Sequence, residues 1–503
     1  MKLLLSKKML PLAIIGILLV VLILKVTLFL TTKPKVTVDY LSRYNEMTRP
    51  QNYDPNKNAA PYFQKAFDVF VKMPDELWMP YTNWPTDFND NEQVIFEKWL
   101  ISNTLAFEYS KEALYKPYYW IKRTAQTDNY LTNNYLGGAP CSDLVQLKKI
   151  TETLGWDAMF KASRGQFQSA FEDVIDCYQT GKYKCSSKLT FVEQQFGLNI
   201  KGEAVRNAFI VLDKSKVDSK AFKFLQDTLQ REFDKDTFLP GCEAEKLYHY
   251  DTLQRLFLDD GKDTGRLWWR AGFGIVIPLA DEGKILERKI QWSCFTGPTR
   301  KQVAEQIEQT ATLFNIVMTK TPWQIKNEGR DYFKEMDDIN KRYIFLKLYH
   351  VGIDPKGIYP SYYKTKSQTE ALIAVLAILR HKTETGQLPE SLDKLVSTGY
   401  LQSVPMDPYS NGSLVYKVAE DNFKLYSVGE NFIDDDGEIK VADRTELPGM
   451  TPDIYSPDII YWPVTELQKL RYEFIKKQSE KIKAEKAAKE AAMQKIPDPN
   501  RPK

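Results

Sequence analysis

Four carboxylates near the end of the chain are the clearest candidate for a chemical site. They fall within five positions: Asp434, Asp435, Asp436 and Glu438. Carboxylates this close repel one another unless a cation offsets their charge, and Ca²⁺ prefers such hard oxygen ligands. The spacing is not that of an EF-hand, because aligning Gly437 with the invariant glycine of that loop leaves Phe432 at the first ligand position. The residues therefore predict either a Ca²⁺ site or a solvated acidic turn.

Sequence patterns of well-known catalytic sites are missing. The three histidines, His249, His350 and His381, lie in unrelated segments, and none stands at metal-ligand spacing from another His or Cys. The sequence has no G-x-S-x-G elbow, Walker A loop, dinucleotide glycine fingerprint or H-E-x-x-H motif. These absences disfavour nucleotide enzymes, zinc proteases and serine hydrolases.

One enzymatic alternative comes from tryptophans and carboxylates in the middle of the chain. Aromatic side chains such as Trp268 and Trp269, beside carboxylates, suit sugar binding, and glycosidases use a carboxylate pair. The candidates for such a pair are Glu243, Glu245, Asp259, Asp260 and Asp263. The spacing selects no pair among them, and aromatics at 13% of the chain are more often core residues. An envelope hydrolase is therefore kept as an alternative.

The residues before the acidic loop predict two helices and a β-hairpin. Leu372, Leu376 and Leu379 fall on one helical face, with Thr369 as the N-cap and Gly386 as the stop. A proline at position 389 suits the first turn of a short second helix. Residues 414–418 and 423–428 are β-branched and aromatic runs, which predicts a hairpin with a four-residue loop.

This order of elements resembles the C-terminal part of the major pseudopilin of type II secretion systems. The shared landmarks are Gly386, Leu388-Pro389, Leu392, Tyr400-Leu401, Pro405, Asp407-Pro408 and Tyr426-Ser427-Val428-Gly429. The chain is more similar still to a group of bacterial membrane-anchored proteins, of no assigned activity, that carry this module behind a long helical region. The resemblance implies Ca²⁺ in the acidic loop. Residues 430–433, just before that loop, differ from the small, Gly-rich residues that pseudopilins usually have there. The pilin processing motif is missing, so the chain is not expected to polymerise as a pilin.

The first 36 residues predict a membrane anchor. Residues 9–24 carry no charge, and with residues 26–30 the apolar run reaches the length of a transmembrane helix, while Lys25 can extend towards the interface. No small-x-small cleavage site follows the run, which favours an uncleaved anchor over a signal peptide. Lys33 and Lys35 nearly balance the lysines before the run. The resemblance places the N-terminus in the cytoplasm and the body outside the membrane.

Helical patterns dominate residues 37–352. The clearest predicts a helical hairpin around Gly165, and further helices are expected over residues 91–115, 193–212, 220–233, 243–258 and 300–317. The hairpin is similar to a tetratricopeptide unit, but no second copy follows near the required period, so helical packing is the better interpretation. An apolar segment over residues 273–280 is too short to span a bilayer. Cys177 and Cys185 predict either a disulfide or two buried thiols.

Charge and composition limit the partners. Both ends of the chain are basic, whereas acidic residues outnumber basic ones in the part between them, which is a poor footprint for nucleic acid. Residues 464–493 are built from strong helix formers and predict an exposed helix.

We therefore predict a mainly α-helical protein in four parts. These are a cytoplasmic start and transmembrane anchor (1–36), a helical extracytoplasmic domain (37–352), an α+β pseudopilin-like module (366–446), and a Pro-rich linker with a basic helical tail (447–503). The predicted function is that of a single-pass interaction or assembly protein without catalytic activity. Its expected partner is a protein of the cell envelope, linked to type II secretion or pilus-like machinery. The alternatives are the glycosidase-like envelope hydrolase and a helical scaffold unrelated to secretion.

Overall fold

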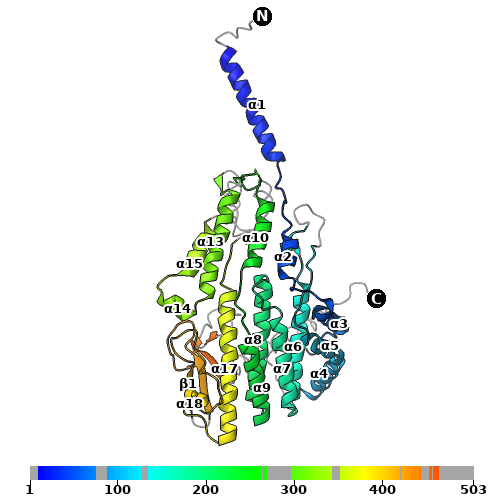
Figure 1. Ribbon diagram of the computed structural model, residues 1–503, viewed down its shortest axis with the longest axis vertical. Helices are drawn as coiled ribbons and strands as arrows, with labels where there is room; N and C mark the ends of the chain where they lie inside the picture. The colour runs from blue at the N-terminus through cyan, green and yellow to red at the C-terminus, as the bar shows by residue number, and fades with distance from the viewer. Residues whose placement is uncertain are drawn as a thin grey trace, which may run out of the picture.

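The computed structural model describes residues 9–74, 77, 88–125, 134–259, 261–262, 264–268, 296–342, 352–419, 422–438, 440–442, 453–455 and 457–463. It is mainly helical, with a small sheet at one side (Figure 1). The α-helices are α1 (Met9–Thr31), α2 (Tyr40–Thr48), α3 (Ala60–Val69), α4 (Asp90–Ser102), α5 (Thr104–Leu114), α6 (Ser142–Ser163), α7 (Phe167–Lys182), α8 (Phe191–Lys214), α9 (Ser219–Asp234), α10 (Glu243–Leu256), α13 (Arg300–Met318), α14 (Pro322–Asn327), α15 (Tyr332–Lys341), α17 (Ile358–Thr385) and α18 (Leu392–Ser397). Short 3-10 helices lie at Pro55–Lys57 and Leu136–Gly138.

Helix α1 projects from one end of the body (Figure 1). Every side chain that is described from Ile14 to Leu28 is exposed, and nearly all of them are large and apolar. Over the described residues, the structure contains no helix with the combined length and apolarity needed to cross a membrane.

The helical body confirms most of the predicted helices. The hairpin is α6 and α7, which turn at Gly165 with φ +77°, and α8, α9, α10 and α13 lie where they were predicted. The helix expected over residues 91–115 is instead two helices, α4 and α5, that meet at Asn103. The buried Asn103 side chain accepts a hydrogen bond from Val71 N (3.0 Å) and donates one to Val71 O (3.1 Å), which fixes the break.

Helix α17 begins earlier than the sequence predicted. Thr369 is not an N-cap: it is buried in the middle of the helix, where its hydroxyl donates to Thr365 O (2.9 Å). The helix starts at Ile358 because Ile358 and Tyr363 pack into one apolar cluster while its later half packs into the main core. The boundary expected over residues 353–366 therefore falls inside the start of a continuous helix. Its predicted end is confirmed, since Gly386 caps it at φ +78°.

The short helix α18 also starts later than predicted. Ser391 is its N-cap and accepts a hydrogen bond from Lys394 N (3.2 Å). Pro389 therefore precedes the helix and does not occupy its first turn.

The sheet has three antiparallel strands in the order β1 (Val415–Ala419), β2 (Asn422–Ser427) and β5 (Ile459–Trp462). A separate pair joins β3 (Lys440–Ala442) to β4 (Asp453–Tyr455). The hairpin is confirmed, but Ala419 pairs with Asn422, so its connection is shorter than the predicted four residues. Strand β5 was not predicted.

Strand β5 extends the module beyond the predicted end at residue 446. Tyr461 and Trp462 are buried; the Trp462 ring stacks on Phe423 at 5.7 Å, and the Tyr461 hydroxyl lies 2.7 Å from Ser367 Oγ on α17. Residues 459–462 are thus part of the sheet and not only a linker. The predicted tail over residues 464–493 and the apolar segment over residues 273–280 lie outside the described residues.

We expect Trp462→Ala to lower the free energy of unfolding by about 3–5 kcal/mol, because it empties a buried indole site beside Phe423 of β2. Val418→Ala is the matched control, since this strand residue is 52% exposed and its loss should change stability by about 0.5 kcal/mol or less. Urea unfolding of both variants measures the difference. Equal effects would show that β5 does not contribute to the sheet in solution.

Candidate functional site

The acidic loop directly follows β2 and is held in place by one buried carboxylate. Asp458 is buried and accepts hydrogen bonds from Gly437 N (2.7 Å) and Asp435 N (3.1 Å). The loop enters through Gly429 at φ +70°, where an added Cβ would lie 2.2 Å from Pro457 O. Sequence reasoning missed Asp458, because its Pro-rich surroundings gave no sign that it returns to the loop.

The carboxylates of the loop point to different partners. Asp434 Oδ1 accepts from the Tyr426 hydroxyl (2.8 Å), and Asp435 Oδ2 accepts from Asn431 Nδ2 (2.7 Å). The Lys417 ammonium pairs with Asp436 and lies 3.8 Å from Asp434 Oδ2. The hydrogen bond and charge of Lys417 lower the pKa of Asp436. A cation from the protein itself therefore offsets part of the charge that the sequence assigned to Ca²⁺.

Glu438 lies exposed at the end of the loop. Among the residues that the structure describes, no group of three or more His, Cys, Asp or Glu is arranged to hold a metal ion. The four predicted ligands thus share one loop without converging on one point, and Ca²⁺ binding there stays a prediction.

The loop also contacts the helical body. Phe432, at φ +62°, places its ring 4.1 Å from Lys326 Nζ of α14 and 6.0 Å from the Tyr409 ring. Nearby, Trp323 N donates to Pro408 O (3.1 Å). A groove of about 350 Å³ runs along this contact and is mostly apolar; its lining is Pro322, Ile325, Lys326, Gly329, Arg330, Asp331, Phe333, Tyr359 and Phe432.

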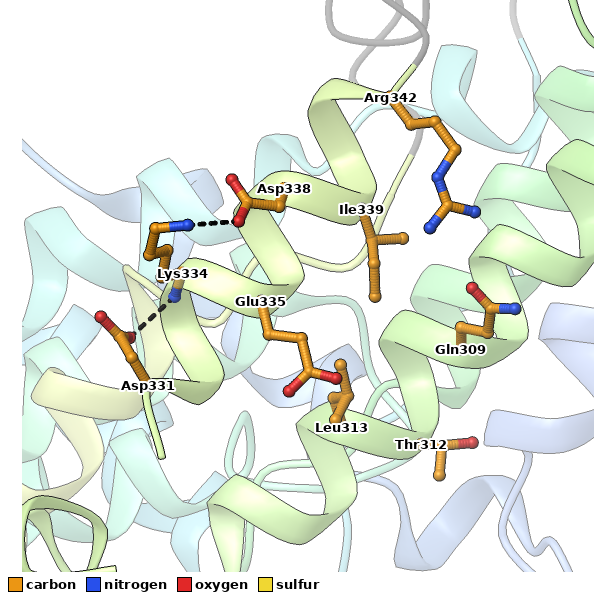
Figure 2. A pocket seen from close by; sticks show the side chains of 9 residues that line it. All are labelled: Gln309, Thr312, Leu313, Asp331, Lys334, Glu335, Asp338, Ile339 and Arg342. Atoms are coloured by element: carbon orange, nitrogen blue, oxygen red, sulfur yellow. Dashed lines mark hydrogen bonds and ion pairs between the residues drawn. The ribbon is translucent and has the colours of Figure 1, made fainter. Parts of the chain in front are cut away.

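A larger groove of about 680 Å³ lies between α13 and α15 (Figure 2). Leu313 and Ile339 form its apolar floor, and the other lining residues are Gln309, Thr312, Asp331, Lys334, Glu335, Asp338 and Arg342. Both grooves include Asp331, so they adjoin along α15. Volumes of this size are typical of binding clefts.

The rim of the α13–α15 groove carries both signs of charge. Lys334 Nζ pairs with Asp338 (2.5 Å), and Glu335 pairs with Arg330 (2.8 Å). Arg342, at the end of α15, extends towards Gln309 of α13 (Figure 2). Helix α15 was not among the predicted helices, although Tyr332, Met336 and Ile339 fall at helical spacing and are buried.

A second concentration of ionisable groups lies inside the body. Arg123 pairs with Asp143 (2.6 Å) and with Glu193 (2.5 Å), while Lys184 lies 2.8 Å from Asp143 Oδ2 and 3.8 Å from Glu193. All four side chains are buried, and the Tyr44 hydroxyl donates to Glu193 Oε2 (2.5 Å). Burial alone would raise the pKa of Asp143, but Lys184 and Arg123 lower it to about 2.

This cluster is suited to holding the fold together. Two cations face two carboxylates, and the Tyr119 hydroxyl donates to Asp143 Oδ2 (3.1 Å), the oxygen that Lys184 also contacts. Neither of the two grooves around α15 includes any of these side chains. Opposite charges paired this closely stay ionised, so the cluster does not supply an acid and a base with pKa values near neutrality.

The three proposed glycosidase carboxylates that the structure describes each have a different partner. Glu243 is exposed and lies 3.6 Å from Lys246, whereas Glu245 accepts a hydrogen bond from Phe191 N (2.5 Å). Asp259 lies 3.7 Å from Arg300. Asp260 and Asp263 are outside the described residues.

A third groove, of about 300 Å³, brings Glu243 near Glu308 between α2, α10 and α13. Lys246 lies between them, 3.0 Å from Glu308. Burial alone would raise the pKa of Glu308, but the hydrogen bonds from Tyr250 and Lys246 and the charge of Lys246 together lower it. A glycosidase acid requires a raised pKa, and the pKa of Glu308 is lowered instead.

The histidines that the structure describes, and the pair Cys177 and Cys185, have surroundings that suit a role in the fold. His249 is buried, which lowers its pKa to about 3, and His381 Nδ1 lies 3.0 Å from Gln387 O; His350 is outside the described residues. Cys177 and Cys185 are free thiols, so no disulfide joins them. Cys177 is buried and donates to Thr151 O (3.3 Å) instead.

Comparisons of the chain with protein-family models, with curated proteins and with solved structures found no match.

We expect Glu245→Gln to weaken the pH dependence of stability. Burial raises the pKa of Glu245 to about 7, partly opposed by the hydrogen bond from Phe191 N. The folded protein thus keeps a proton that the unfolded chain releases near pH 4.5, and this stabilisation is lost as the pH rises to about 7. The variant should lose less stability than the wild type between about pH 5 and pH 8 in urea unfolding. Glu243→Gln, in the same helical turn but exposed, should behave like the wild type.

We expect Lys417→Gln to increase the stabilisation of the protein by Ca²⁺. Removing the ammonium leaves Asp434 and Asp436 without their cation, and an ion that binds only the folded state raises its melting temperature. Melting in Ca²⁺ and in chelator measures the effect, with Lys394→Gln on α18 as the control. If neither the wild type nor Lys417→Gln responds to Ca²⁺, the loop is a solvated acidic turn.

Proposed function

We propose that this chain is a membrane-anchored, extracytoplasmic interaction or assembly protein. Its partner-binding surface comprises the two grooves around α15 and the adjoining acidic loop. The observation that carries the proposal is the continuity of these features: the α13–α15 groove, the groove beneath Phe432 and the carboxylates after Phe432 adjoin one another. An apolar floor within a charged rim suits a segment of another protein, because the floor supplies burial and the rim supplies orientation.

The chemistry of the α13–α15 groove favours an amphipathic helix as the bound segment. Leu313 and Ile339 would meet its apolar face, and Lys334 and Glu335 offer both signs of charge to its flanks. Helices of this kind bind in grooves through apolar side chains at helical spacing.

Helix α1 is proposed as the single membrane anchor. Its support is the uncharged run of residues 9–24 together with the exposure of the apolar side chains from Ile14 to Leu28, which would be unfavourable in water. The cytoplasmic N-terminus is supported only by the resemblance, because Lys33 and Lys35 nearly balance the lysines before the run. A link to type II secretion or pilus-like machinery is supported only by the residue pattern of the C-terminal module.

We expect a photo-crosslinking residue at Thr312 or Lys334, introduced into the full-length protein in its native membrane, to form a specific protein adduct. Both positions line the α13–α15 groove, and Lys223 on α9 is an exposed control outside it. Thr312→Trp should block the groove and remove the adduct formed from Lys334. Mass spectrometry identifies the partner. The proposal fails if the Lys223 position gives the same adducts, or if Thr312→Trp leaves them unchanged.

A further inference from the structure

The chain that leaves α1 is clamped by one buried amide to the body near the C-terminus of α10. Gln254 of α10 is fully buried; its Oε1 accepts hydrogen bonds from Thr37 N and Val38 N (3.1 Å each), and its Nε2 donates to Val38 O (2.8 Å). The side chain thus satisfies three backbone groups of two consecutive residues, Thr37 and Val38.

The clamp is itself held rigidly. Asp251 Oδ1 accepts from Gln254 Nε2 (2.9 Å) and from Arg255 Nε (2.8 Å), and its Oδ2 accepts from Leu136 N (2.7 Å). One turn away, the Tyr250 ring stacks on Tyr40 of α2 at 6.3 Å. Residues 32–37 can span at most about 20 Å between α1 and the clamp. The body is therefore tethered closely and at a fixed point.

The clamp determines which end of the body faces α1. The C-terminus of α10 is joined to residues 257–268, since Trp268 N donates to Leu256 O (2.7 Å). Arg300 N, at the start of α13, donates to Gly265 O (2.9 Å). These segments lie at the end from which α1 projects, and α18 with the end of α17 lies at the opposite end (Figure 1).

The end that faces α1 displays exposed cations. They are Lys33, Lys35, Lys262, Arg266 and Lys301. Asp259 is partly neutralised by Arg300, and Lys301 lies 4.0 Å from Glu305. Asp260 and Asp263 lie outside the described residues. Lysine and arginine at the edge of a bilayer bind the phosphates of lipid headgroups.

We propose that this end of the body, formed by the C-terminus of α10, residues 257–268 and the N-terminus of α13, lies against the lipid headgroups and is held there by the Gln254 clamp. The inference rests on the proposed anchoring by α1. It adds a second contact with the membrane, made by the folded body, and it fixes the orientation of the grooves relative to the bilayer.

Lysine labelling of the full-length protein in vesicles that contain phosphatidylglycerol tests the inference. An amine-reactive reagent added outside the vesicles, followed by mass spectrometry, should modify Lys262 and Lys301 several-fold more slowly than Lys220 and Lys394 at the far end. Gln254→Leu removes the three hydrogen bonds of the clamp. In this variant Lys262 and Lys301 should approach the rate of the far-end lysines, while circular dichroism confirms that the helices remain.

Labelling of Lys33 and Lys35 distinguishes failure of the anchoring proposal from failure of the headgroup contact, because both lysines directly follow α1. If they are labelled as fast as Lys220, α1 is not in the bilayer and the anchoring proposal fails. If they are protected while Lys262 and Lys301 react like Lys220, the anchor holds but the body does not lie on the headgroups. Protection of Lys262 and Lys301 that persists in Gln254→Leu would show that the clamp does not set the orientation.

Discussion

The arrangement of the body depends on the buried pairing of Arg123 and Lys184 with Asp143 and Glu193. Removing four charges from water costs several kcal/mol for each, and only close pairing of opposite signs offsets that cost. The four side chains come from separate segments: the extended chain at 123, the start of α6, the turn after α7 and the start of α8. Every segment must therefore reach one point in one orientation. Through its hydroxyl, Tyr44 adds α2 to the same point, so the chain that follows α1 is fixed to the core by charge as well as by the Gln254 clamp.

Helix α17 connects the helical body to the sheet. Its first half packs with α13, α14 and α15 in one apolar cluster, and its second half packs with α8, α9 and the sheet in the main core. Both clusters thus share helix α17, and the contact between Phe432 and Lys326 joins regions that this helix already connects. A partner that bound the α13–α15 groove would be in contact with elements continuous with the acidic loop. The α13–α15 groove and the acidic loop are therefore best considered as one surface.

Sequence patterns predicted the features that depend on residues close together in the chain. The helices of the body followed from apolar side chains at helical spacing, and Gly386 marked a helix end because only glycine adopts its positive φ without strain. Strand β5 was missed because it lies among prolines and is stabilised by contacts far away in the sequence, such as that of Trp462 with Phe423. The four acidic residues of the loop lie together because they are neighbours in the sequence, and their role as ligands stays a prediction; their surroundings could not be predicted. No sequence spacing shows that Lys417 lies beside Asp436, nor that Asp458 receives the backbone of the loop.

The position of the grooves limits how a partner can approach. Helices α13, α15 and α14 and then the sheet follow one another along one side of the body, from the end near α1 towards the far end (Figure 1). A partner that contacts both the α13–α15 groove and the acidic loop must therefore lie alongside the body and not across its far end. With α1 in a bilayer and the clamp holding the body upright, that side would face other envelope proteins laterally. A single helix of the partner could then bind the α13–α15 groove while the residues next to that helix reach Phe432. The affinity would come from two adjoining sites together and would exceed the affinity of either site alone.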